Sequence, residues 1–159
     1  RDPRDVLVSE YFSNAYSHAL PTEKADVSVL AGERRNALNS SLEAYVESRV
    51  QPLNNTVEGY RTLLDDPELK VLRYEDVIFN KDDWIRAIAA HFDLAAPDAL
   101  IQNILGWADV RPAAEDPTAF VRKVAPGDHR DKLAPEAIAR VNARLSDLWE
   151  ALGYRIQED

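Results

Sequence analysis

Most of this chain carries apolar residues at helical spacing, and only one short segment alternates as a strand does. Segment 69–74 alternates apolar and polar residues and predicts the one strand. One strand cannot satisfy its own N–H and C=O groups, so an α/β fold would need further strands outside this sequence. Helices are predicted over residues 3–19, 33–64, 82–92, 97–107 and 135–152.

Proline and glycine place further limits on these helices. Pro52 lies inside the long helical stretch and is expected to break or kink it. Segment 108–133 has no regular period and holds three prolines and a Pro-Gly pair. An irregular stretch of this length is uncommon in a compact domain and is often functional. We therefore expect segment 108–133 to be a long loop with a role in binding.

Charge and composition exclude several function classes. The 159 residues carry a net charge of −9 at pH 7, which argues against a nucleic-acid partner, because such proteins need a basic face. An anionic small ligand would need a local basic cluster. No apolar run approaches the roughly 18 residues of a membrane span, so no membrane segment is expected in this chain.

Cysteine and methionine are both absent. Without cysteine there are no disulfides and no thiolate chemistry, and a reducing, cytoplasmic location is favoured. The three histidines are too scattered to predict a metal site. The missing methionine and the abrupt charged start suggest that sequence is missing upstream, including any targeting signal.

Three places hold candidate binding residues. Arg1 and Ser9 flank a predicted helix start, and helix N-termini attract phosphate, although a capped surface helix with a solvated arginine explains the same pattern. Arg122 and Lys123 precede a Pro-Gly turn and could fold over an anion, or they could belong to an ordinary exposed loop. Tyr74 ends the predicted strand, where α/β proteins bind ligands, but a tyrosine at the edge of the core is also common.

Taken in order, these segments resemble motifs of one enzyme family. Segment 1–9 (RDPRDVLVS) resembles the 3′-phosphate-binding motif of sulfotransferases that use 3′-phosphoadenosine 5′-phosphosulfate (PAPS). Segment 71–76 (VLRYED) resembles the family strand that ends in Tyr-Glu-Asp. Segment 122–131 (RKVAPGDHRD) resembles the late Arg-Lys-Gly-x-x-Gly-Asp-Trp-Lys-Asn loop, and LAPE at 133–136 resembles the start of the last family helix. The resemblance covers essentially the whole chain.

The resemblance implies a fold and a domain organisation. The family fold is α/β, with a parallel sheet flanked by helices and related to P-loop kinases. This chain resembles the helix-rich C-terminal portion of that fold, so residues 1–159 are expected to be a partial sulfotransferase domain. The phosphosulfate loop and the usual catalytic base lie upstream of the first motif in the family. The catalytic residues are therefore expected outside this chain, and the chain alone is expected to be inactive.

The resemblance also implies an activity and site residues. The expected reaction moves a sulfuryl group from PAPS to a hydroxyl or amine of a small-molecule or carbohydrate acceptor, with no metal ion. By position in the motifs, Arg1, Ser9, Arg122 and Lys123 would bind the 3′-phosphate of the donor, and Tyr74 would lie near its adenine.

The chain departs from the family pattern at three positions of the late motif. Val124 stands where the family has glycine, His129 where it has tryptophan, and Arg130 where it has lysine. The change to Val124 affects any backbone N–H contact that needs glycine geometry, whereas His129 and Arg130 retain a ring and a cation. Two other interpretations stay open: another nucleotide-dependent transferase or kinase of related fold, which should not select for a 3′-phosphate, and a non-catalytic helical interaction module, which should bind no nucleotide.

Overall fold

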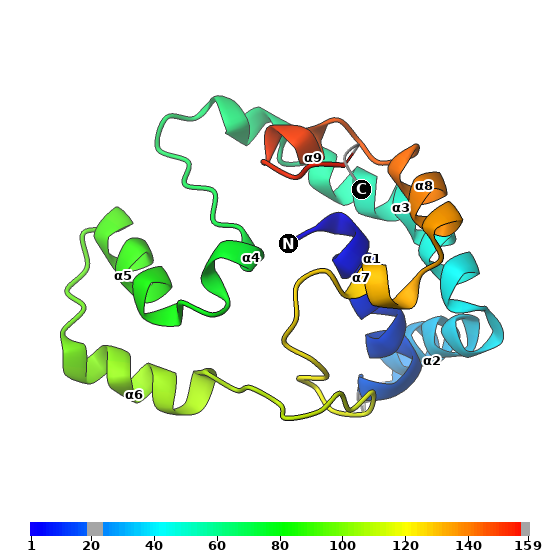
Figure 1. Cartoon of the computed structure of the whole chain (residues 1–159), viewed down its shortest axis with the longest axis horizontal. Helices are drawn as coiled ribbons and strands as arrows, with labels where there is room; N and C mark the ends of the chain where they lie inside the picture. The colour runs from blue at the N-terminus through cyan, green and yellow to red at the C-terminus, as the bar shows by residue number, and fades with distance from the viewer. Residues whose placement is uncertain (19–23, 157–159) are drawn as a thin grey trace.

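The structure, a computed structural model, describes residues 1–18 and 24–156, and every regular element in those ranges is a helix (Figure 1). Irregular segments join the helices, among them a long one over residues 109–127, and no β-strand is present among the described residues. In chain order the elements are α1 (Pro3–Phe12), the π-helical η1 (Ser13–Ser17), α2 (Lys24–Asn39), α3 (Leu42–Glu58), the 3-10 helix η2 (Arg61–Asp65), α4 (Tyr74–Val77), α5 (Lys81–His91), α6 (Asp98–Ala108), α7 (Asp128–Lys132), α8 (Pro135–Asn142) and α9 (Leu148–Ala151).

The predicted strand, and with it the α/β parallel-sheet fold, is wrong for the described part of the chain. Residues 70–73 are irregular, and Tyr74 begins the short helix α4 instead of ending a strand. Leu69 and Val71 supply the apolar half of the alternation, and both are exposed. Alternation describes one chain segment only, whereas a strand also needs a neighbouring strand to pair with its N–H and C=O groups. No described segment supplies that neighbour.

Helix α1 begins where the sequence predicts. Pro3 occupies the first turn, and the Asp2 side chain accepts a hydrogen bond from the backbone N–H of Arg4 at 2.9 Å. The same carboxylate forms an ion pair with the Arg4 guanidinium at 2.8 Å. The helix continues through η1 to Ser17, and its predicted end near residue 19 lies outside the described residues.

The predicted long helix over residues 33–64 is divided in two, but not at proline. Helix α2 ends at Asn39, and Ser41 caps α3 by accepting a hydrogen bond from the Ala44 N–H at 3.2 Å. Pro52 lies inside α3 and is exposed to solvent. Proline has no N–H to donate, so one carbonyl in the preceding turn lacks its helical partner, and water can hydrogen-bond to it instead. A serine cap therefore separates the helices.

The main core forms where α1 and α8 both pack against α3. Leu7 and Val8 of α1 are completely buried in this cluster, and so are Val46 and Val50 of α3. Val141 of α8 completes the cluster. Burial of apolar side chains is the dominant favourable term in folding, so this contact fixes α1 firmly in the molecule.

The predicted helix over residues 135–152 is also two helices, α8 and α9. Asn54 of α3 is buried at the bend between them: its Nδ2 donates to the Arg144 carbonyl at 2.8 Å, and its Oδ1 accepts from the Ser146 N–H at 3.1 Å. Leu148 and Trp149 of α9 pack in a second cluster with Val57. The C-terminal helices are thus tied to α3 along its length.

Helices α4, α5 and α6 form an arm on the side of the molecule opposite α2 and α8 (Figure 1). Both α5 and α6 confirm helices predicted from sequence. The arm is joined to the rest at α4, where Glu75 accepts hydrogen bonds from the Asp2 N–H at 2.7 Å and the Tyr154 hydroxyl at 3.3 Å. No helix in the described ranges is long and apolar enough to span a membrane.

Candidate functional site

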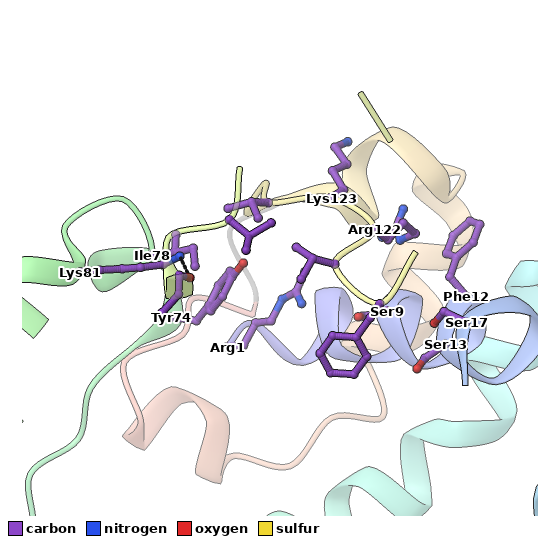
Figure 2. A pocket seen from close by; sticks show the side chains of 15 residues that line it. Arg1, Ser9, Phe12, Ser13, Ser17, Tyr74, Ile78, Lys81, Arg122 and Lys123 are labelled. Atoms are coloured by element: carbon purple, nitrogen blue, oxygen red, sulfur yellow. Dashed lines mark hydrogen bonds between the residues drawn. The ribbon is translucent and has the colours of Figure 1, made fainter. Parts of the chain in front are cut away.

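A pocket of about 270 Å³ lies between α1, α4 and the segment that follows α6 (Figure 2). The five site residues expected from the sequence all line it, although they come from three separate parts of the chain. Figure 2 shows Arg1 between Tyr74 and Ser9, with Arg122 and Lys123 on the late segment. The lining includes Arg1, Ser9, Tyr74, Arg122 and Lys123.

Arg1 and Tyr74 form one wall of the pocket. The Arg1 guanidinium carbon lies 4.7 Å from the centroid of the Tyr74 ring, which is a cation–π contact. Arg1 Nε is buried and has no hydrogen-bond partner among the described residues. Buried N–H groups are rarely left unpaired, so this donor is exceptional among the described residues. Burial raises the pKa of the Tyr74 hydroxyl, which therefore stays protonated at neutral pH.

The first-turn amides of α1 do not form this site. The Asp2 carboxylate already accepts from the Arg4 N–H, so the chain caps its own helix end. Ser9, two turns further along, lines the pocket together with Phe12 and Ser13. What this part of the chain contributes to the pocket is therefore side chains: Arg1, just before α1, and Ser9 within it.

Arg122 and Lys123 reach the pocket already paired with carboxylates. Arg122 contacts both Glu115 and Asp128, and its guanidinium carbon lies 4.2 Å from the Phe12 ring centroid. Lys123 Nζ lies 2.8 Å from Asp128 and 3.2 Å from Asp131. The hydrogen bond to Asp128 raises the pKa of Lys123. A bound anion would share these cations with the protein's own carboxylates.

Asp128 joins the two cations. Its side chain is almost completely buried, and burial by itself raises the pKa of a carboxyl group. Hydrogen bonds from Arg122 and Lys123 outweigh burial, so the pKa of Asp128 is lowered. The carboxylate is therefore ionised and holds both basic side chains at one point.

Asp5 connects α1 to the late segment and was missed as a site residue by the sequence reasoning. Its completely buried carboxylate accepts hydrogen bonds from the Gly127 N–H at 2.6 Å, the His129 N–H at 3.0 Å and His129 Nδ1 at 2.7 Å. Gly127 has φ +85°, a left-handed conformation that favours glycine. The sequence signals were an aspartate in the first motif and a Pro-Gly turn in the third, but nothing in the spacing pairs them.

Burial and hydrogen bonding act in opposite directions on Asp5. Burial raises the pKa of its carboxyl group, while the hydrogen bonds from His129 and Gly127 lower it, and the result is a pKa of about 2. Asp5 is thus charged at every pH at which the protein is expected to work. No described group of three or more acidic, histidine or cysteine side chains is arranged to hold a metal ion.

The family model of the sulfotransferase domain matches residues 1–152. No curated protein sequence and no solved structure matches the chain. Because the family match spans nearly the whole chain, the chain belongs to the sulfotransferase domain family. Enzymes of this class transfer sulfuryl groups to acceptor molecules.

Proposed function

We propose that the pocket binds the adenosine 3′-phosphate part of PAPS and that the chain supplies this donor-binding part of a sulfotransferase. One observation carries the proposal: three segments far apart in the sequence bring cationic and hydroxyl side chains to one pocket. The segments are those in which the sequence resembles the family motifs. The family match supports the reaction class, and the pocket supports the donor.

The residues present fit a phosphate group. Arg1 has a buried Nε without a partner, and Ser9 offers a hydroxyl from the neighbouring turns of α1. Arg122 and Lys123 are cations that the protein's own carboxylates already pair with, and a phosphate that shares them would gain charge-assisted hydrogen bonds from this side as well. The Tyr74 ring, which already stacks on Arg1, offers an aromatic face to the adenine.

The role of these residues in transfer is binding and orientation. PAPS supplies a sulfuryl group on a phosphate leaving group; the sulfur–oxygen bond to that phosphate breaks as one to the acceptor oxygen or nitrogen forms. Such in-line transfers depend on positioning and on charge stabilisation. Holding the 3′-phosphate at four side chains would fix the donor against rotation. We further propose a small-molecule or carbohydrate acceptor and, from the absence of cysteine, a cytoplasmic location.

The test compares two nucleotides that differ only in the 3′-phosphate. Binding of 3′,5′-bisphosphoadenosine and of AMP to the full chain is measured by isothermal titration calorimetry. We expect the bisphosphate to bind at least about tenfold more tightly, because one charged hydrogen bond is worth about 1.5–3 kcal/mol. Arg1→Ala should abolish most of this preference. Arg140→Ala is the matched control, because Arg140 of α8 pairs with Glu47 of α3 and does not line the pocket.

The other outcomes identify the rival functions. Equal affinities for the two nucleotides would contradict the assignment to PAPS and favour another nucleotide-dependent transferase. Absence of binding to either nucleotide would favour a helical interaction module.

A further inference from the structure

We infer that Asp5 is a positioning residue that sets where Arg122 and Lys123 stand relative to Arg1 and Ser9. Asp5 does not line the pocket and acts through Gly127 and His129 instead. The inference rests on the proposed function of the pocket. It adds to that function a residue that does not itself contact the donor.

A continuous set of contacts leads from Asp5 to the basic pair. Asp5 accepts hydrogen bonds from Gly127 and His129, the two residues on either side of Asp128 in the chain. The carboxylate of Asp128 in turn accepts hydrogen bonds from Arg122 and from Lys123 Nζ, the latter at 2.8 Å. Fixing residues 127 and 129 therefore fixes the carboxylate that holds both cations.

The two halves of the pocket differ in how they are held. Arg1 and Ser9 belong to α1, whose Leu7 and Val8 are completely buried in the main core. Segment 109–127 contains no regular element, and Phe120 within it is 89% exposed. An irregular segment depends on individual side-chain contacts for its position. Asp5 supplies such a contact from the rigid half to the irregular half.

A pre-positioned pair of cations should bind an anion more tightly than a mobile pair. If the late segment must be ordered when the ligand arrives, the cost of ordering is subtracted from the binding free energy. Loss of the Asp5 contact should therefore weaken ligands that need Arg122 and Lys123 and spare those that do not. A 3′-phosphate belongs to the first class, and AMP belongs to the second.

Asp5→Asn is the most informative change, because it preserves size but not acceptor capacity. The two carboxylate oxygens face three donors, namely two backbone N–H groups and His129 Nδ1. The amide of asparagine has one acceptor oxygen and one NH₂ donor group. In the variant, at least one of these three donors must therefore face the NH₂ group of the asparagine, and that hydrogen bond is lost.

The control is Asn54→Ala. Asn54 is also buried and also joins two distant segments by hydrogen bonds, to Arg144 and Ser146, but it does not line the pocket. We expect Asp5→Asn to weaken binding of 3′,5′-bisphosphoadenosine by about tenfold and binding of AMP by less than about twofold. Asn54→Ala should leave the ratio of the two affinities unchanged.

Failure of the inference and failure of the proposed function give different results. If wild type prefers the bisphosphate and Asp5→Asn keeps the same ratio, Asp5 is only structural and the pocket assignment survives. If wild type shows no preference, both are overturned. If Asp5→Asn lowers both affinities equally, the effect is general and the inference is wrong.

A second pair of variants leaves Asp5 unchanged and alters its partner, His129. His129→Ala removes the ring donor, whereas His129→Asn retains a side-chain N–H at a similar distance from the backbone. We expect His129→Ala to reduce the preference for the bisphosphate and His129→Asn to restore part of it. Equal preferences in wild type and both variants would contradict a positioning role. Faster amide exchange at Gly127 and His129 in the weakened variants would locate the effect in this contact.

Discussion

The carboxylate of Asp5 lies 2.7 Å from Nδ1 of His129, although the two residues are 124 positions apart in the chain. This contact brings the late segment against α1 and so brings Arg122 and Lys123 to the side of Arg1 and Ser9. The protein's own hydrogen bonds therefore account for the meeting of these four residues. These contacts lie within the protein itself and join the late segment to α1.

Removing Arg122 should weaken binding selectively. We expect Arg122→Ala to weaken 3′,5′-bisphosphoadenosine binding by about 10- to 150-fold, because a charged hydrogen bond contributes about 1.5–3 kcal/mol. AMP binding should change little. Ser9→Ala should show the same selectivity with a smaller loss. Calorimetric titration with both nucleotides checks this, and equal losses for the two would contradict a contact with the 3′-phosphate.

Removing a competing carboxylate should have the opposite effect. Glu115 pairs with Arg122 and, at 2.8 Å, with Lys132, so it competes with an anion for Arg122. We expect Glu115→Gln to tighten bisphosphoadenosine binding by about two- to fivefold. Glu47→Gln removes the same charge from a surface pair with Arg140 and controls for net charge. An equal gain in both variants would show a long-range effect of charge and not a local one.

The ionised Asp5 should contribute to stability in a definite pH range. Its pKa is lowered from the ordinary 3.8 to about 2 in the folded protein, so its contribution is fully present above pH 4 and is lost as the pH falls toward 2. The shift corresponds to about 2 kcal/mol. The stability advantage of wild type over Asp5→Asn, measured by urea unfolding, should therefore shrink by about that amount between pH 5 and pH 2. A constant difference would mean that Asp5 is not ionised as described.

The main core should be sensitive at α1. Leu7 is completely buried, and Leu7→Ala should lower the free energy of unfolding by about 2–5 kcal/mol. Leu38 of α2 is 53% exposed, and Leu38→Ala should change it by less than about 0.5 kcal/mol. Chemical unfolding of the two variants beside wild type gives the comparison. Equal losses would argue against the packing of α1 on α3 in the main core.

Local signals predicted the elements that depend on neighbouring residues. Asp2 and Pro3 predicted the start of α1, and Pro135 predicted the start of α8, because a cap or a fixed backbone angle acts within one helical turn. Ser41 has the residue type of a helix cap, but the break in the long helix was predicted at Pro52, and that prediction was wrong. The exposed position of Pro52 makes the missing hydrogen bond tolerable, and exposure is a property of the folded molecule.

The sequence by itself predicted helices α5 and α6, the starts of α1 and α8, the family and the five residues that line one pocket, because each depends on short motifs or periodic spacing. Tertiary structure alone decided that segment 69–74 does not form a strand and that Asp5 holds Gly127 and His129. Both depend on partners far away in the chain. A hydrogen bond across more than a hundred residues leaves no periodic trace in sequence, since either partner also suits an ordinary cap or turn.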